Sequence, residues 1–125
     1  MKYALEESTV LKICEIFTRY AQVEKVILYG SRAKGNYKNG SDIDLTLDGD
    51  ESLNLDVLFK IIDDIDELYL PYTFDLSIFP DLRDQDVIDH IRRVGVIFYA
   101  RKFPAYGVSK SSNSLFSGIS AIEWP

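Results

Sequence analysis

Cysteine, basic charge and long apolar runs are all scarce in this 125-residue sequence. The single cysteine, Cys14, excludes an intrachain disulfide and a cysteine-rich zinc site. No run approaches the roughly 20 apolar residues that a transmembrane helix requires, and the first residues lack the basic and apolar layout of a signal peptide. We therefore expect a soluble, cytoplasmic protein that has no association with a membrane.

The shortage of positive charge narrows the range of ligands. The chain has 14 Lys and Arg residues against 20 Asp and Glu residues, which gives a formal net charge of −6 and a pI near 4.7. Long nucleic acids are bound largely by basic side chains that neutralise phosphates, so this balance argues against such a ligand. The densest basic cluster, Arg32, Lys34 and Lys38, suffices for one triphosphate. The charge balance favours a small nucleotide and a protein partner.

The apolar content is sufficient for one small folded domain. Hydrophobic residues make up 46% of the chain and charged residues 27%, so a packed core can form without disulfides or a structural metal. Periodicity predicts a helix that Ser8 caps, a strand, a one-turn helix, a strand, a helix, a strand, a helix that Asp84 caps, and a last strand. The corresponding ranges are 10–21, 26–29, 31–35, 42–47, 53–70, 72–79, 84–95 and 96–99. We assign residues 1–103 to this domain and expect the Ser/Gly-rich tail, 104–125, to be disordered or to bind a partner.

A glycine-punctuated turn follows the first predicted strand. The strand ends at Gly30-Ser31, and Gly35 is a suitable stop for one helical turn. Glycine allows the backbone to approach a phosphate closely, and amides at a helix start bind anions. We therefore expect Gly30 and Ser31 to bind a nucleotide. Arg32 and Lys34 either contact its β- and γ-phosphates or lie in solvent.

Two carboxylates on the second predicted strand suggest a metal site. Asp42 and Asp44 stand two residues apart and so point to the same face of the strand. A divalent cation relieves the repulsion between such charges, and oxygen ligands suit Mg²⁺. Asp75 lies on the next predicted strand, and if the two strands pair, three carboxylates converge. They could hold two metal ions about 4 Å apart, or Asp75 could act as the base for an attacking hydroxyl.

Each of these residues also has a simpler interpretation. Asp42 alone could be a turn residue, and Asp75 could be a solvent-facing strand residue. Asp44 is harder to dismiss because it lies inside an apolar strand, where an uncompensated charge is costly. His90 has no cysteine or second histidine nearby in the sequence, which favours a structural or surface role over metal ligation.

Together these residues resemble a known signature. Gly30-Ser31, ten intervening residues and Asp42-Ile43-Asp44 resemble the Gly-Ser-x10-Asp-x-Asp motif of the DNA polymerase β-like nucleotidyltransferase superfamily. Within it, residues 5–102 resemble the minimal nucleotidyltransferases, or MNT proteins, whose third carboxylate corresponds to Asp75. The resemblance implies an α/β (α+β) fold, with a small mixed β-sheet flanked by helices. It also implies Mg²⁺ as cofactor, ATP as substrate, and a nucleotide and metal site at the residues named above.

The same resemblance implies a protein partner. Minimal members commonly pair with a helical HEPN-family protein, often as a toxin–antitoxin system. In such a heteromeric complex the MntA-type antitoxin transfers AMP to a tyrosine of the toxin. We therefore expect an enzyme that transfers AMP from ATP to a hydroxyl of a HEPN-family protein.

Two other functions are compatible with the same fold. A binding module would neutralise its partner by complex formation alone, although it would have no physical need for three converging carboxylates. Transfer to a small molecule such as an aminoglycoside is the other alternative, although a chain of this size leaves little to build an acceptor pocket.

Overall fold

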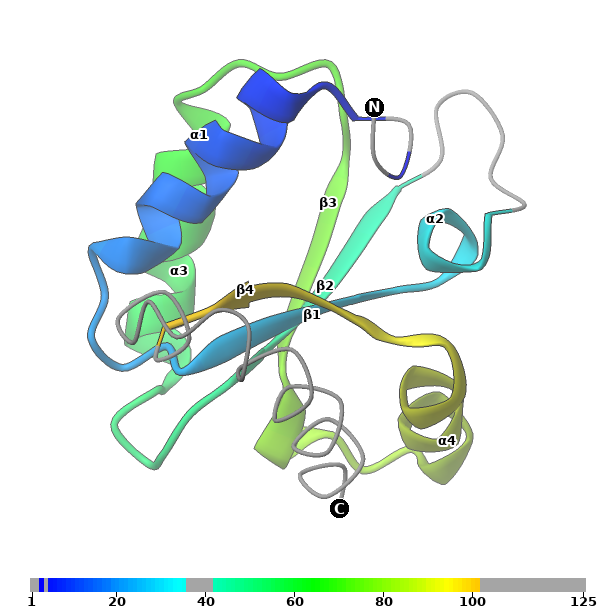
Figure 1. Ribbon diagram of the computed structural model, residues 1–125. Coiled ribbons are helices and arrows are strands. Elements are labelled where there is room, and N and C mark those ends of the chain that lie inside the picture. The colour runs from blue at the N-terminus through cyan, green and yellow to red at the C-terminus, as the bar shows by residue number, and fades with distance from the viewer. Residues whose placement is uncertain (1–2, 4, 36–41, 102–125) are drawn as a thin grey trace, which may run out of the picture.

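The computed structural model describes residues 3, 5–35 and 42–101, and it alternates helices with strands (Figure 1). In chain order the elements are α1 (Glu7–Thr18), β1 (Lys25–Tyr29), α2 (Ser31–Lys34), β2 (Ile43–Asp48), α3 (Leu55–Asp66), β3 (Phe74–Ile78), the 3-10 turn η1 (Phe79–Asp81), α4 (Gln85–Val94) and β4 (Val96–Ala100). This order confirms the predicted succession of elements. The predicted tail, 104–125, lies outside the described residues. Within the described ranges, no helix is both long and apolar enough to cross a membrane.

The four strands form one mixed sheet in the order β3-β2-β1-β4. β1 pairs antiparallel with β2 and with β4, whereas β2 and β3 run parallel. Parallel neighbours need a long crossover connection, and α3 supplies it between β2 and β3. The predicted mixed sheet flanked by helices is therefore confirmed, and β1 and β2 are its two inner strands.

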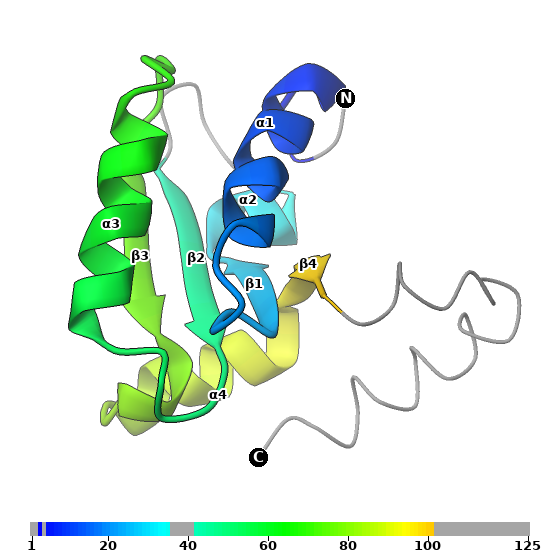
Figure 2. The same ribbon diagram turned by 90° about the vertical axis from the view of Figure 1, so that its left-hand side faces the viewer.

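Helices cover both faces of this sheet. α1 and α3 lie together on one face, and α4 lies on the other (Figure 2). Successive side chains of β1 pack on opposite faces of the sheet. Val26 and Leu28 pack in the larger core with α1 and α3. Ile27 lies between them in the sequence and packs on the opposite face with Phe79 and Ile91.

The alternation along β2 decides which face carries the polar residues. Ile43, Leu45 and Leu47 are fully buried in the larger core under α1 and α3. Successive side chains of a strand point to opposite faces, so Asp44 and Thr46 lie on the face that α4 covers only in part.

The start of α1 differs from the prediction. The helix begins at Glu7, Glu6 occupies the N-cap position, and no side chain caps the first turn. Ser8 is therefore inside the helix and does not cap it. The fully buried Leu5 anchors the chain just before the helix, which leaves Ser8 too late in the sequence for the capping position.

The other two long helices begin at side-chain caps. Asn54 Oδ1 accepts a hydrogen bond from the Val57 amide at 3.1 Å, so α3 begins later than the predicted start at residue 53. It also ends at Asp66, before the predicted end at residue 70. The cap predicted at Asp84 is confirmed, because its carboxylate accepts from the Asp86 amide at 2.9 Å.

Arg101 ties the end of β4 to the end of α1. Its guanidinium donates to the carbonyl oxygens of Phe17 at 3.1 Å, Tyr20 at 2.6 Å and Val23 at 3.0 Å. These carbonyls belong to the end of α1 and to the turn that follows it. Arg101 therefore joins the last described strand to the first helix.

Candidate active site

The site is built around a sharp turn at Gly30, where β1 passes into α2. Gly30 has φ +80° and ψ −160°, a backbone conformation that is essentially restricted to glycine. A Cβ atom at this position would overlap Oδ2 of Asp44. The missing side chain therefore lets the backbone of the turn lie directly against a carboxylate of β2.

α2 is the predicted single helical turn. The amide of Lys34 donates to the carbonyl of Gly30 at 3.1 Å, and the amide of Gly35 donates to the carbonyl of Ser31 at 2.9 Å. Gly35 then adopts the left-handed conformation, with φ +88°, and ends the helix as predicted. The turn holds Ser31 half-buried and Lys34 exposed.

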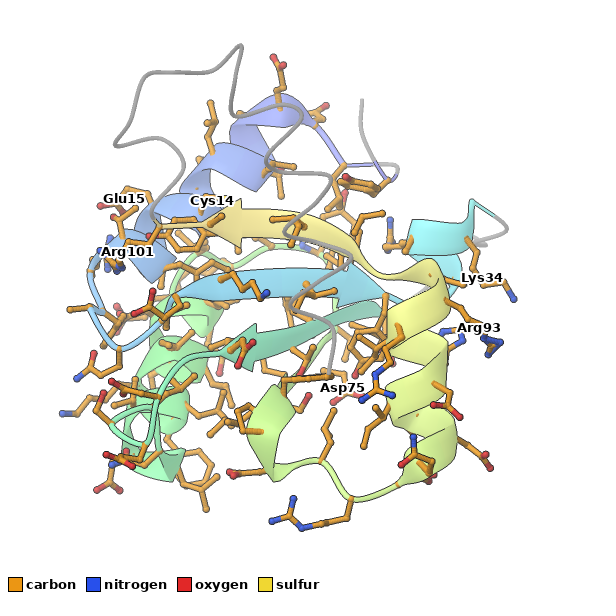
Figure 3. The ribbon with its side chains drawn as sticks, turned by 60° about the horizontal axis from the view of Figure 1, so that its bottom comes forward. Cys14, Glu15, Lys34, Asp75, Arg93 and Arg101 are labelled. Atoms are coloured by element: carbon orange, nitrogen blue, oxygen red, sulfur yellow. The ribbon has the colours of Figure 1, made fainter. Side chains whose placement is uncertain are left out.

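Two of the three predicted carboxylates lie directly side by side. Asp44 of β2 is the register partner of Asp75 of β3, and on its other side it faces Tyr29 of β1. Asp75, labelled in Figure 3, is exposed, and Asp44 is half-buried. Asp42 is exposed and stands immediately before β2. The expected pairing of the two strands is therefore confirmed.

The charged form of the Asp44 carboxyl is disfavoured by its surroundings. Burial, and then the negative charges of Asp75 and Asp42, raise the pKa of the Asp44 carboxyl from its ordinary 3.8 to about 6. Ionisation of Asp44 is therefore less favourable than that of an ordinary aspartate, although the charged form still predominates at neutral pH. A cation beside the carboxylates would reverse this penalty.

The donor atoms fit a hard divalent cation only in part. All three side chains offer carboxylate oxygens, the ligands that Mg²⁺ prefers. Among the described residues, however, no three Asp, Glu, His or Cys side chains are gathered closely enough to hold a metal ion. Asp44 and Asp75 are register partners on neighbouring strands, and Asp42 would have to join them to complete such a site.

A row of hydroxyl groups continues from the carboxylates along the same face. Ser77 is the register partner of Thr46, and its Oγ donates to Thr46 Oγ1 at 2.9 Å. Burial raises the pKa of the Tyr29 phenol, and a hydrogen bond with Ser77 offsets part of this rise. Sequence reasoning missed these three residues. The signal was present, because Thr46 and Ser77 each follow a predicted carboxylate at the period-two spacing of a strand.

Arg32 is buried and contacts residues outside the glycine turn. Its side chain is 4% exposed, Nη1 donates to the carbonyl of Tyr3 at 2.9 Å, and the guanidinium lies 5.2 Å from the centroid of the Tyr72 ring. A buried guanidinium with these partners favours an anchoring role, and the phosphate contact of Arg32 stays a prediction. Lys34, two residues on, is exposed beside the turn.

Comparison with known proteins supplies the family. Residues 11–103 match the profile of the family described as Polymerase beta, Nucleotidyltransferase. The chain belongs to this family. The matched range includes Gly30, Ser31 and all three predicted carboxylates.

Solved structures share the fold of this nucleotidyltransferase. One chain of a toxin–antitoxin complex with AMP-PNP is 14% identical with a TM-score of 0.60, and the alignment covers 94% of this chain and 91% of that chain. One chain of the tri-AMPylated Shewanella oneidensis HEPN toxin in complex with MNT antitoxin is 12% identical with a TM-score of 0.58, covering 94% and 91% respectively. No curated protein sequence matches the chain. At these identities the likeness establishes the fold alone.

Proposed function

We propose that this nucleotidyltransferase transfers AMP from ATP to a tyrosine hydroxyl of a HEPN-family partner, and that it is the antitoxin of a toxin–antitoxin pair. The observation that carries the proposal is the register pairing of Asp44 with Asp75 beside the Gly30 turn. The family supports nucleotidyl transfer. The acceptor is proposed from the fold shared with complexes that contain AMP-PNP and an AMPylated HEPN toxin.

Mg²⁺ is the cofactor that we propose for the carboxylates of β2 and β3. Asp44 and Asp75 would bind it from neighbouring strands, and Asp42 would complete the ligand set from the residue before β2. When bound, the metal would neutralise the carboxylates and stabilise the charge that develops on the phosphate oxygens. Gly30 and Ser31 would bind the nucleotide, because the glycine turn lets its backbone approach a phosphate next to Asp44.

The transfer itself needs an acceptor oxygen, a base and a leaving group. The tyrosine oxygen of the partner attacks the α-phosphorus of ATP and forms a new phosphorus–oxygen bond. The bond between the α-phosphorus and the bridging oxygen to the β-phosphate breaks, and pyrophosphate leaves. Asp75 is the exposed member of the pair, so it is the carboxylate that an acceptor hydroxyl from outside can reach and to which it can pass its proton.

The test is transfer to the co-purifying or co-expressed HEPN partner. Purified nucleotidyltransferase, partner, ATP and Mg²⁺ are incubated, and intact-protein and peptide mass spectrometry locate AMP on the partner. Asp75→Asn should abolish the modification, whereas Glu51→Gln, which removes the same charge from an exposed turn, should leave it unchanged. Chelation of the metal with EDTA should also abolish it.

One result would favour the binding-module alternative instead. If the Asp75→Asn variant neutralised the partner as well as the wild type did, and no AMP appeared on the partner, then complex formation alone would explain the activity. AMP on an added aminoglycoside, with none on the partner, would indicate a small-molecule acceptor.

A further inference from the structure

An apolar strip, made of Leu55, Phe59 and Ile62, runs along α3 beside the edge of the sheet. Leu55 and Phe59 lie one helical turn apart, and each is 56% exposed. Ile62 comes about one turn later and lines a hollow of about 260 Å³ that Phe74 and Leu76 of β3 also line. Figure 2 shows α3 lying alongside β3. Exposed apolar side chains that continue into a hollow are typical of a surface that binds a partner.

β3 offers backbone groups at this edge. Among the described strands, β3 stands at the end of the sheet and pairs with β2 alone. The carbonyl of Thr73 accepts a hydrogen bond from the Ile43 amide at 2.8 Å, so the backbone groups of Thr73 point toward β2. Because this direction alternates along a strand, the amides and carbonyls of Phe74 and Leu76 point toward the open edge. Such an edge can pair with an added strand.

A strand added at this edge would divide its side chains between the two faces of the sheet. Phe74 and Leu76 pack toward the larger core, on the side of α3, whereas Asp75 lies between them in the sequence and so on the face of Asp44. Side chains that are paired in register share a face. The residue beside Asp75 would therefore present its side chain to the carboxylates. Its two neighbours in the sequence would lie on the face of the apolar strip.

The charge of this surface favours a basic partner segment. α3 contains four aspartates and one lysine. One of the aspartates, Asp66, lines the hollow itself, and the exposed Asp75 adds a further negative charge at the same edge. Opposite charge across an interface favours association and sets its register. The complementary segment therefore combines apolar residues with basic ones.

We propose that the acceptor binds as an extended strand along the edge of β3, with its tyrosine beside Asp75 and its apolar and basic residues against the apolar strip. The inference rests on the proposed function, because it takes a tyrosine of the partner as the acceptor. It adds the surface on which that tyrosine docks. It also requires that the tyrosine lie outside the helices of the partner, since the backbone groups of a helix are already paired within it.

The first experiment measures the kinetics of AMP transfer to the full-length partner, at saturating ATP and Mg²⁺. Phe59→Gln and Leu55→Gln should each raise KM for the partner about tenfold and leave KM for ATP unchanged. Leu11→Gln is the matched control and should match the wild type, because Leu11 is 67% exposed on α1, which contacts β4 at the other edge. Glutamine is a good helix former, so these variants should fold, and their melting temperatures check this. Asp66→Asn should also raise KM for the partner.

The second experiment tests the pairing of the backbone. Hydrogen exchange of individual amides is measured by NMR on the full-length chain, with and without the partner. The amides of Phe74 and Leu76 should gain protection when the partner binds, whereas those of β4 at the other edge should not change. A partner helix lying on the apolar strip would leave the Phe74 and Leu76 amides as they were, and this result would overturn the strand arrangement.

The outcomes separate this inference from the function on which it rests. If the wild type transfers no AMP to the partner, the proposed function fails. If transfer occurs but Phe59→Gln and Leu55→Gln keep the KM of Leu11→Gln, only the docking surface fails. An unchanged KM for Asp66→Asn would overturn the basic character of the segment.

Discussion

The half-buried carboxylate of Asp44 should make the metal-free protein less stable than it could be. Burial and two neighbouring carboxylates raise its folded-state pKa to about 6, above the ordinary 3.8 that applies when the chain is unfolded. Between these values the folded protein holds a proton that the unfolded chain has lost. Stability should therefore fall as the pH rises from about 4 to about 6, and should stay level above that window.

The size of the effect follows from the shift. A difference of about two pKa units corresponds to at most about 3 kcal/mol. Because Asp44 is partly open to solvent, screening reduces this to about 1 kcal/mol. Asp44→Asn removes the charge, so it should stabilise the metal-free protein at pH 7.5 by about 1 kcal/mol, which raises the melting temperature by about 4 °C for a domain of this size.

The assay is thermal unfolding in EDTA at pH 4.5 and at pH 7.5, with Glu51→Gln as the control for a lost surface charge. Asp44→Asn should gain stability over the wild type at pH 7.5 and lose most of that gain at pH 4.5. With Mg²⁺ and ATP added, the order should reverse, because only the wild type can bind the metal at this site. An Asp44→Asn variant that is less stable than the wild type at pH 7.5 in EDTA would refute the argument.

Four further substitutions test other contacts. Gly30→Ala should lower stability by about 1–3 kcal/mol and abolish AMP transfer, because the new Cβ displaces Asp44. Gly35→Ala is the matched control, since Gly35 also has a positive φ but has open space around the Cβ position. It should lower stability by about 1 kcal/mol and leave AMP transfer unchanged. Arg32→Lys should lower the melting temperature without changing KM for ATP, and a raised KM at unchanged stability would restore its predicted phosphate contact. Arg101→Lys should lower the urea unfolding midpoint by an amount equivalent to about 2 kcal/mol, since one ammonium group cannot reproduce the hydrogen bonds of the guanidinium to several carbonyl oxygens. An unchanged midpoint would show that these hydrogen bonds do not contribute to stability.

Local patterns were sufficient for most of the fold. Period-two alternation predicted that Asp44 and Asp75 point away from the apolar face of their strands, and the structure pairs them in register. The stop at Gly35 and the cap at Asp84 were also predicted, because each depends on a few consecutive residues. The cap predicted at Ser8 was wrong, because the N-cap position is Glu6, two residues earlier and directly after the buried Leu5.

The sequence by itself determined the chemistry that this protein can present: a glycine turn, two carboxylates on one strand and a third on the next, each legible from spacing along the chain. Only the tertiary structure decided how the cations are used. Arg32 and Lys34 look equivalent in a four-residue helix, yet contacts with the distant Tyr3 and Tyr72 bury the first and leave the second exposed. Such roles depend on which elements pack together, and no local pattern encodes that packing.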